Sequence, residues 1–136
     1  MYTADLIQFI GEFLGTFMFL FFAFAAANIA LQDCATCGLG DSPSVAQLLY
    51  ISLAFGFSLA VNAWVFFRIS GGLFNPAVTF GLMLIGCLTL FRAGVVFIAQ
   101  ILGAIAAAAV VKGLFPYVSS PTWQLVSMIR FANSGR

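Results

Sequence analysis

Three long apolar runs constrain this chain more than any other feature. They cover about residues 6–31, 48–67 and 93–111, and a single charged residue, Glu12, interrupts the first of them. Each run is close to the roughly 20 residues that a helix needs to cross the hydrocarbon core of a bilayer. No segment shows the sustained alternation of polar and apolar residues that a membrane barrel requires. The sequence therefore predicts an all-α, multi-pass integral membrane protein with three spanning helices.

The charge content narrows the function. Only 7% of the 136 residues are charged, whereas soluble domains carry about 25%. The expected partner of most of the surface is therefore the lipid bilayer. A net charge of +1 without a basic run argues against nucleic-acid binding, and the absence of histidine excludes His-based catalysis and metal ligation. We find no nucleophile, base or ligand cluster, so neither an enzyme nor a cofactor nor a metal site is expected.

The segment 69–88, which lies between Arg68 and Arg92, is too short to be a fourth span. Its apolar part from Pro76 to Leu88 would be about 20 Å long as a helix. Asn75 is a good N-cap and Pro76 suits the first helical position. The Gly-rich residues before them are not expected to be helical, and such backbone is tolerated at membrane depth only where it lines a cavity or is buried in protein. We expect a re-entrant loop followed by a half-helix.

A half-helix of this kind can line a pore. The Asn75 amide would donate to a water or hydroxyl oxygen, and the positive end of the helix would repel cations. The carbonyl oxygens of Gly71, Gly72 and Leu73 would accept from the same file of solute molecules. In the alternative interpretation, Asn-Pro only initiates a turn and Gly-Gly is a flexible link.

Several motifs along the chain together resemble those of a known family. ISGGLFNPAVT is similar to the first signature loop of the aquaporins, or major intrinsic proteins. GEFLGT, SLAFGFSLAV and FRAGVVFIAQILGAI are similar to motifs of that family's first three helices, and the resemblance covers about residues 8–115. It implies that residues 1–115 form an aquaporin-like half, the N-terminal repeat. Leu73 stands where many members have histidine, with Phe74 next to it, which resembles the fungal-type pattern.

The resemblance also implies roles for individual residues. Asn75, Pro76 and Ala77 match the first of two signature tripeptides that meet at the pore centre. Phe55 matches the aromatic residue of the selectivity filter, whereas Glu12 and Gln100 match polar positions that brace re-entrant backbone. Two alternatives remain open: Glu12 is neutral or snorkels near a helix end, and Phe55 is an ordinary packing or lipid-facing ring.

The implied function is passive transport of water, extending to small neutral solutes such as glycerol, with the plasma membrane as the expected location. The family pore consists of two inverted repeats, and this sequence holds only one, which predicts a truncated chain. The family tetramer implies a homo- or hetero-oligomer. The alternative function is a non-conducting membrane partner that assembles with full-length channels and modulates them.

Several remaining features carry less specific expectations. Arg68 and Arg92 flank the half-helix loop. From the positive-inside rule we expect this loop and the N-terminus to lie in the cytoplasm.

Cys34 and Cys37 form a lone CxxC, which is more typical of free thiols or a local disulfide than of a metal site. Residues 116–136 form a divergent tail. Small residues four apart predict close helix packing at three pairs: Gly11 and Gly15, Gly56 and Ala60, and Gly103 and Ala107.

Overall fold

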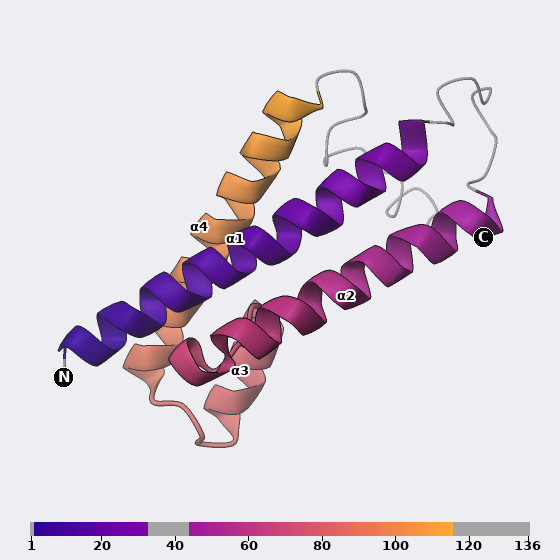
Figure 1. The fold of residues 1–136 in the computed structure, drawn as a ribbon. Helices are drawn as coiled ribbons and strands as arrows, with labels where there is room; N and C mark the ends of the chain where they lie inside the picture. The colour runs from indigo at the N-terminus through magenta and orange to yellow at the C-terminus, as the bar shows by residue number, and fades with distance from the viewer. Residues whose placement is uncertain (1, 33–43, 116–136) are drawn as a thin grey trace, which may run out of the picture.

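The computed structural model describes residues 2–32 and 44–115, and all regular structure within them is helical. The chain forms α1 (Tyr2–Gln32), α2 (Val45–Ser70), α3 (Pro76–Leu84) and α4 (Leu90–Leu114). Both α2 and α4 pack against α1, and the short α3 packs against α4 (Figure 1). The predicted tail 116–136 and the Cys34/Cys37 pair lie outside the described residues.

The three long helices extend a few residues beyond the predicted spans at both ends. α2 begins at Val45 because Ser44 and Gln47 form a capping box, in which each side chain accepts a backbone N–H of the other residue. It ends at Ser70, and the next residue, Gly71, caps the helix in a left-handed conformation (φ 97°) with its N–H bonded to the carbonyl of Phe67. All three helices are long and apolar enough to cross a membrane. The protein is thus an integral membrane protein.

The half-helix α3 begins where the sequence predicts and ends earlier. The Asn75 side chain accepts the N–H of Ala77, and Pro76 opens the first turn. The helix stops at Leu84 rather than near Leu88, because the chain turns at Gly86, which has a φ of 78°. Nine residues rise about 14 Å, less than half of an apolar bilayer core.

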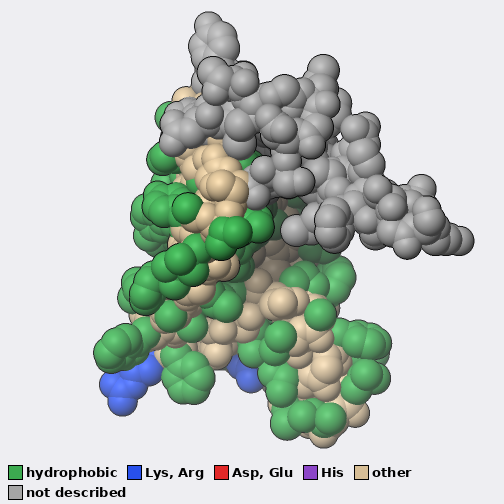
Figure 2. All heavy atoms as spheres, turned by 90° about the vertical axis from the view of Figure 1, so that its right-hand side faces the viewer, with side chains coloured by type: hydrophobic (Ala, Val, Ile, Leu, Met, Phe, Trp, Pro, Cys, Tyr) green, Lys and Arg blue, Asp and Glu red, His purple; other side chains and the backbone are tan. Residues whose placement is uncertain are grey.

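The interior is built from small and polar side chains, and the large apolar ones face outward. Trp64 is 86% exposed, whereas Glu12 is completely buried. Figure 2 shows hydrophobic side chains spread over the helices, with basic side chains gathered at the lower end of the molecule. This distribution is expected of a protein whose solvent is lipid, where close packing rather than the hydrophobic effect joins the helices. The buried apolar residues of α1 and α4 are mostly alanines: Ala23, Ala27, Ala30, Ala93, Ala99 and Ala107.

The small-residue pairs behave differently from one another. On α1, an added methyl group at Gly11 would lie 2.9 Å from the Ser70 Cβ, and one at Gly15 would overlap the Phe74 ring. On α4, Gly103 lies against the backbone of α1 at Phe13. Gly56 and Ala60 are both exposed, and no atom of the described residues lies within 4 Å of a Cβ built at Gly56, so close packing at this pair stays a prediction. The described part of α2 turns this pair away from its neighbours.

Candidate functional site

Glu12 is the centre of a buried hydrogen-bond network that joins three segments distant in the sequence. Its Oε1 accepts from the Ser70 hydroxyl (2.7 Å) and from the Leu73 N–H (3.0 Å). Its Oε2 accepts from the Phe74 N–H (2.9 Å) and from Nε2 of Gln100 (2.9 Å). All four partners are donors, so both carboxylate oxygens are used as acceptors.

The position of Glu12 tests the alternative in which its side chain snorkels near a helix end. Its side chain is 0% exposed, in the first half of α1, and faces the loop between α2 and α3. The alternative of a carboxylate snorkelling near the helix end is therefore wrong. The four donors pair both oxygens of this buried carboxyl group, and a polar side chain inside a membrane requires such partners.

Gln100 extends the network from α1 to the half-helix. Its Nε2 donates to the Thr79 hydroxyl (3.0 Å) as well as to Glu12. The Thr79 hydroxyl in turn lies 3.1 Å from the carbonyl oxygen of Asn75, to which it donates. Gln100 and Thr79 are each 1% exposed. The start of α3 is thus connected through two buried side chains to the carboxylate on α1.

The loop between α2 and α3 is a defined conformation and not a flexible link. Gly71 and Gly72 have φ values of 97° and 63°, in the left-handed region of backbone conformation that glycine adopts more readily than other residues. Phe74 has a φ of 45°, which is uncommon for a residue with a side chain. Its ring is 3% exposed and packs against Phe66 at a centroid distance of 6.0 Å, in the space left by Gly15. Buried packing and the Glu12 bond hold this strained residue in place.

Several polar groups at and just before the start of α3 have no hydrogen-bond partner within the described chain. The Asn75 residue is exposed, and its side-chain oxygen caps the helix, so that its Nδ2 is left without a partner among the described residues. The carbonyl oxygens of Gly71, Gly72 and Leu73 likewise accept no hydrogen bond from the described part of the chain. The site therefore presents one amide donor and three carbonyl acceptors.

Phe55 lies on α2, half-buried, with its ring edge-on to Phe19 and Phe24 of α1 at centroid distances of 6.2 Å. The structure brings it together with α1 and not with the described loop. Its expected role in a filter therefore stays a prediction.

Three residues of the network carried no expectation. They are Ser70, Thr79 and Phe74, which are buried and help to hold the loop. In the sequence alone, the two hydroxyl residues are typical of a turn, and Phe74 is one of many apolar residues. One signal was present: Gly15 follows Glu12 by three residues, which leaves room on the same face of α1 for a large side chain such as Phe74.

The fold and this site define a class of protein: a multi-span membrane protein in which a short helix and its strained entry loop are held between spans by a buried carboxylate. The chain belongs to the major intrinsic protein family, whose family model matches residues 3–134. That match reaches past Phe115, where the resemblance recognised in the sequence ended.

The curated relatives are aquaporins. The chain is 58% identical over 112 residues to aquaporin-7 of Botryotinia fuckeliana (strain B05.10), which covers 79% of this chain and 24% of the relative. It is 55% identical over 111 residues to aquaporin-2 of the same organism, covering 81% and 29%. Probable aquaporin-5 of Gibberella zeae is 55% identical over 113 residues, covering 79% and 21%. The chain thus spans about a quarter of the length of these relatives.

Proposed function

We propose that this chain forms part of the wall of a channel for passive transport of water and of small neutral solutes such as glycerol, in the plasma membrane. Its action would be transport and not catalysis. The observation that carries the proposal is the set of four hydrogen bonds on Glu12. They hold the loop, in which the carbonyls of Gly71, Gly72 and Leu73 and the Nδ2 of Asn75 bond to no described residue.

The proposal assigns a role to each part of the site. The Nδ2 of Asn75 would donate to a solute oxygen, and the carbonyls of Gly71, Gly72 and Leu73 would accept from its O–H groups. Pro76 and Ala77 would set the first turn of α3, whose N–H groups and partial positive charge oppose cations.

Three further residues would support the pathway. Glu12 and Gln100 would position the loop without touching solute, because both are buried within the network. The Phe55 ring would narrow the pathway and disfavour bulky solutes.

The exposed edge of the site supports assembly with further protein. Asn75 and Ala77 are exposed, and the preceding residues are not helical. Non-helical backbone cannot face lipid, so protein or water must cover this edge within a bilayer. An arrangement of one aquaporin-like repeat, residues 1–115, within a homo- or hetero-oligomer would supply this cover.

A second candidate function rests on the same exposed edge. The chain would bind a full-length relative through α3 and the loop, and would modulate that channel without conducting. Co-purification with such a relative, followed by permeability measurements with and without this chain, separates the two functions. A change in the relative's permeability that the chain alone cannot produce favours the modulator.

Substitution of Asn75 tests the channel. Because aspartate and serine are also good N-caps, Asn75→Asp and Asn75→Ser should both keep α3 folded. The aspartate places a negative charge at the helix start, so we expect it to lower water permeability and to admit cations. The serine removes the amide donor without adding charge, and should lower permeability while cations stay excluded.

The measurement is stopped-flow swelling of vesicles at several protein-to-lipid ratios, together with a fluorescent assay of ion leak. Permeability of the parent chain that never exceeds that of empty vesicles would reject conduction by this chain alone. Unchanged permeability and leak in both variants of a conducting sample would reject the assigned role of Asn75.

A further inference from the structure

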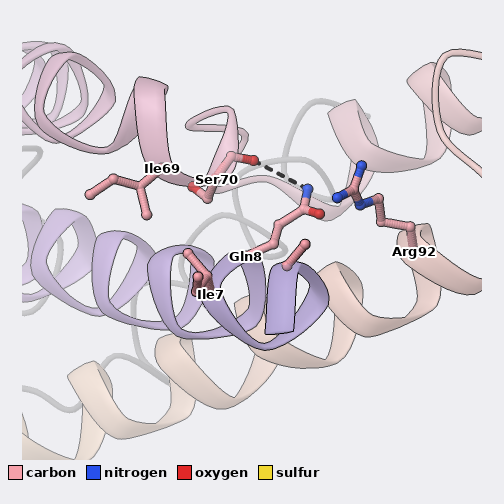
Figure 3. Close-up of a pocket in the computed structure, with 6 residues that line it drawn as sticks. Ile7, Gln8, Ile69, Ser70 and Arg92 are labelled. Carbon is pink, nitrogen blue, oxygen red and sulfur yellow. Dashed lines mark hydrogen bonds between the residues drawn. The ribbon is translucent and has the colours of Figure 1, made fainter. Parts of the chain in front are cut away.

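A hollow of about 320 Å³ lies at the end of the molecule where α1 begins, α2 ends and α4 begins (Figure 3). Its volume is at the lower end of that of small-molecule sites and is well above the space that one water needs. It is separate from the exposed face of the loop. The hollow is lined by Ala4, Ile7, Gln8, Ile69, Ser70 and Arg92.

Gln8 supplies a buried acceptor to this hollow. Its side chain is 8% exposed, and its Nε2 donates to the backbone carbonyl of Ser70 (3.2 Å). The other end of the amide, Oε1, is buried and has no hydrogen-bond partner within the described chain. A buried carbonyl oxygen without a donor is unfavourable. A ligand that brings an N–H or O–H group to this oxygen would therefore be favoured.

Arg92 supplies a positive charge on the other side. It extends from α4 toward the space that Gln8 enters from α1 (Figure 3). Its Nε lies 3.5 Å from Oδ1 of Asp5, an ion pair without a hydrogen bond. The two terminal nitrogens bond to no described residue, so the edge of the guanidinium away from Asp5 is open to a planar or tetrahedral acceptor. Phosphate and carboxylate groups both match the geometry of this fork.

The surroundings indicate where such a ligand comes from. Arg92 lies at the start of a membrane-spanning helix, and Arg68 lies in the last turn of another at the same end. The rim of the hollow is apolar and open, with Ile7 and Ile69 about half exposed. A phosphate at the membrane surface that is attached to apolar chains belongs to a phospholipid, and basic pockets between spanning helices bind such headgroups.

We propose that this hollow binds a phospholipid whose headgroup carries a hydrogen-bond donor, such as ethanolamine. The phosphate accepts from the terminal nitrogens of Arg92, the ammonium group donates to Oε1 of Gln8, and an acyl chain lies along Ile7 and Ile69. Choline has no N–H or O–H and would leave the Gln8 oxygen unpaired. The site therefore selects phosphatidylethanolamine over phosphatidylcholine, two lipids of equal net charge.

The test uses the detergent-purified, delipidated chain and native mass spectrometry with the two lipids on identical acyl chains. We expect retention of phosphatidylethanolamine to exceed that of phosphatidylcholine by about tenfold, the order expected of one hydrogen bond from a charged donor. Gln8→Met should abolish this preference. Arg92→Gln should lower the retention of both lipids. This variant should fold, because the Arg92 side chain is 43% exposed. The matched control is Arg68→Gln, a charge at the same end that does not line the hollow.

Each contrary outcome overturns the proposal. Equal retention of the two lipids by the parent chain would show that Gln8 accepts no hydrogen bond from the headgroup. If Arg68→Gln lowered lipid retention as much as Arg92→Gln, the lipids would be held by surface charge alone. If soluble phosphoethanolamine competed as well as the intact lipid, the ligand would be a soluble molecule. If neither lipid bound, the hollow would hold only water.

Discussion

At the scale of single residues, one carboxylate determines the shape of the loop. Glu12 accepts two bonds from backbone N–H groups of successive loop residues and two from side chains of other helices. Because Glu12 is completely buried, a buried donor that lost this acceptor would be left without a partner. We therefore expect Glu12 to act by positioning the loop.

Replacement of Glu12 tests this position. In Glu12→Gln one oxygen becomes an NH₂ group that faces donors, so at least one donor loses its acceptor. We expect the free energy of unfolding to fall by about 1–3 kcal/mol for each unpaired donor. Unfolding in mixed micelles, followed by circular dichroism, measures the loss. Asp5→Asn is the control, because it breaks a partly exposed ion pair worth less than about 1 kcal/mol. Equal losses in the two variants would contradict the role of Glu12.

At the scale of helices, the loop packs against α1 at Gly15, which has no side chain. The Phe74 ring occupies the space above Gly15, and α4 approaches the backbone of α1 through Gly103. In a membrane the packing of small residues against neighbouring atoms supplies much of the association energy. The fit between α1 and the ring therefore sets the position of the loop together with the Glu12 bonds.

A pair of glycine-to-alanine variants tests this fit. A methyl group at Gly15 overlaps the Phe74 ring, so Gly15→Ala should cost about 1–3 kcal/mol of unfolding free energy. Gly56 also lies within a spanning helix but has open space beside it, so Gly56→Ala should be neutral or stabilise by up to about 1 kcal/mol. Thermal unfolding in detergent compares them. A loss in Gly56→Ala as large as that in Gly15→Ala would contradict the packing explanation.

At the scale of the whole molecule, the polar groups gather inside and at one end. α1 separates α2 from α4 (Figure 1), and the network, the loop and α3 lie toward the end where α1 begins. Arg68 and Arg92 mark this end, and Lys112 lies in the last turn of α4 at the other. From the positive-inside rule we expect the arginine end to lie in the cytoplasm.

The exposed Cys87 between α3 and α4 makes this orientation measurable. With Cys34 and Cys37 changed to serine, Cys87 is the remaining thiol of the sequence. We expect a membrane-impermeant maleimide to label it in inside-out vesicles and not in sealed right-side-out cells. Labelling from outside intact cells would reverse the orientation. A variant that keeps only Cys34 and Cys37 gives the control for the opposite loop.

Some local features could be predicted from residue order alone, and others could not. Asn75 and Pro76 mark the start of α3 because capping and proline preferences depend only on neighbouring residues. The start of α2 was placed three residues late, because Gln47 looks like a loop residue unless its bond to Ser44 is seen. The end of α3 was placed late because apolar residues continue through the turn at Gly86.

The sequence by itself determined the solvent, the number of spans, the family and the candidacy of Glu12, since these follow from composition, run length and local motifs. The tertiary structure decided what Glu12 binds, why Gly15 is small, that Gly56 faces outward and that Gln8 keeps an unpaired oxygen. Contacts between residues 58 to 88 positions apart leave no periodic trace in the chain. They form only when α1, the loop and α4 pack together.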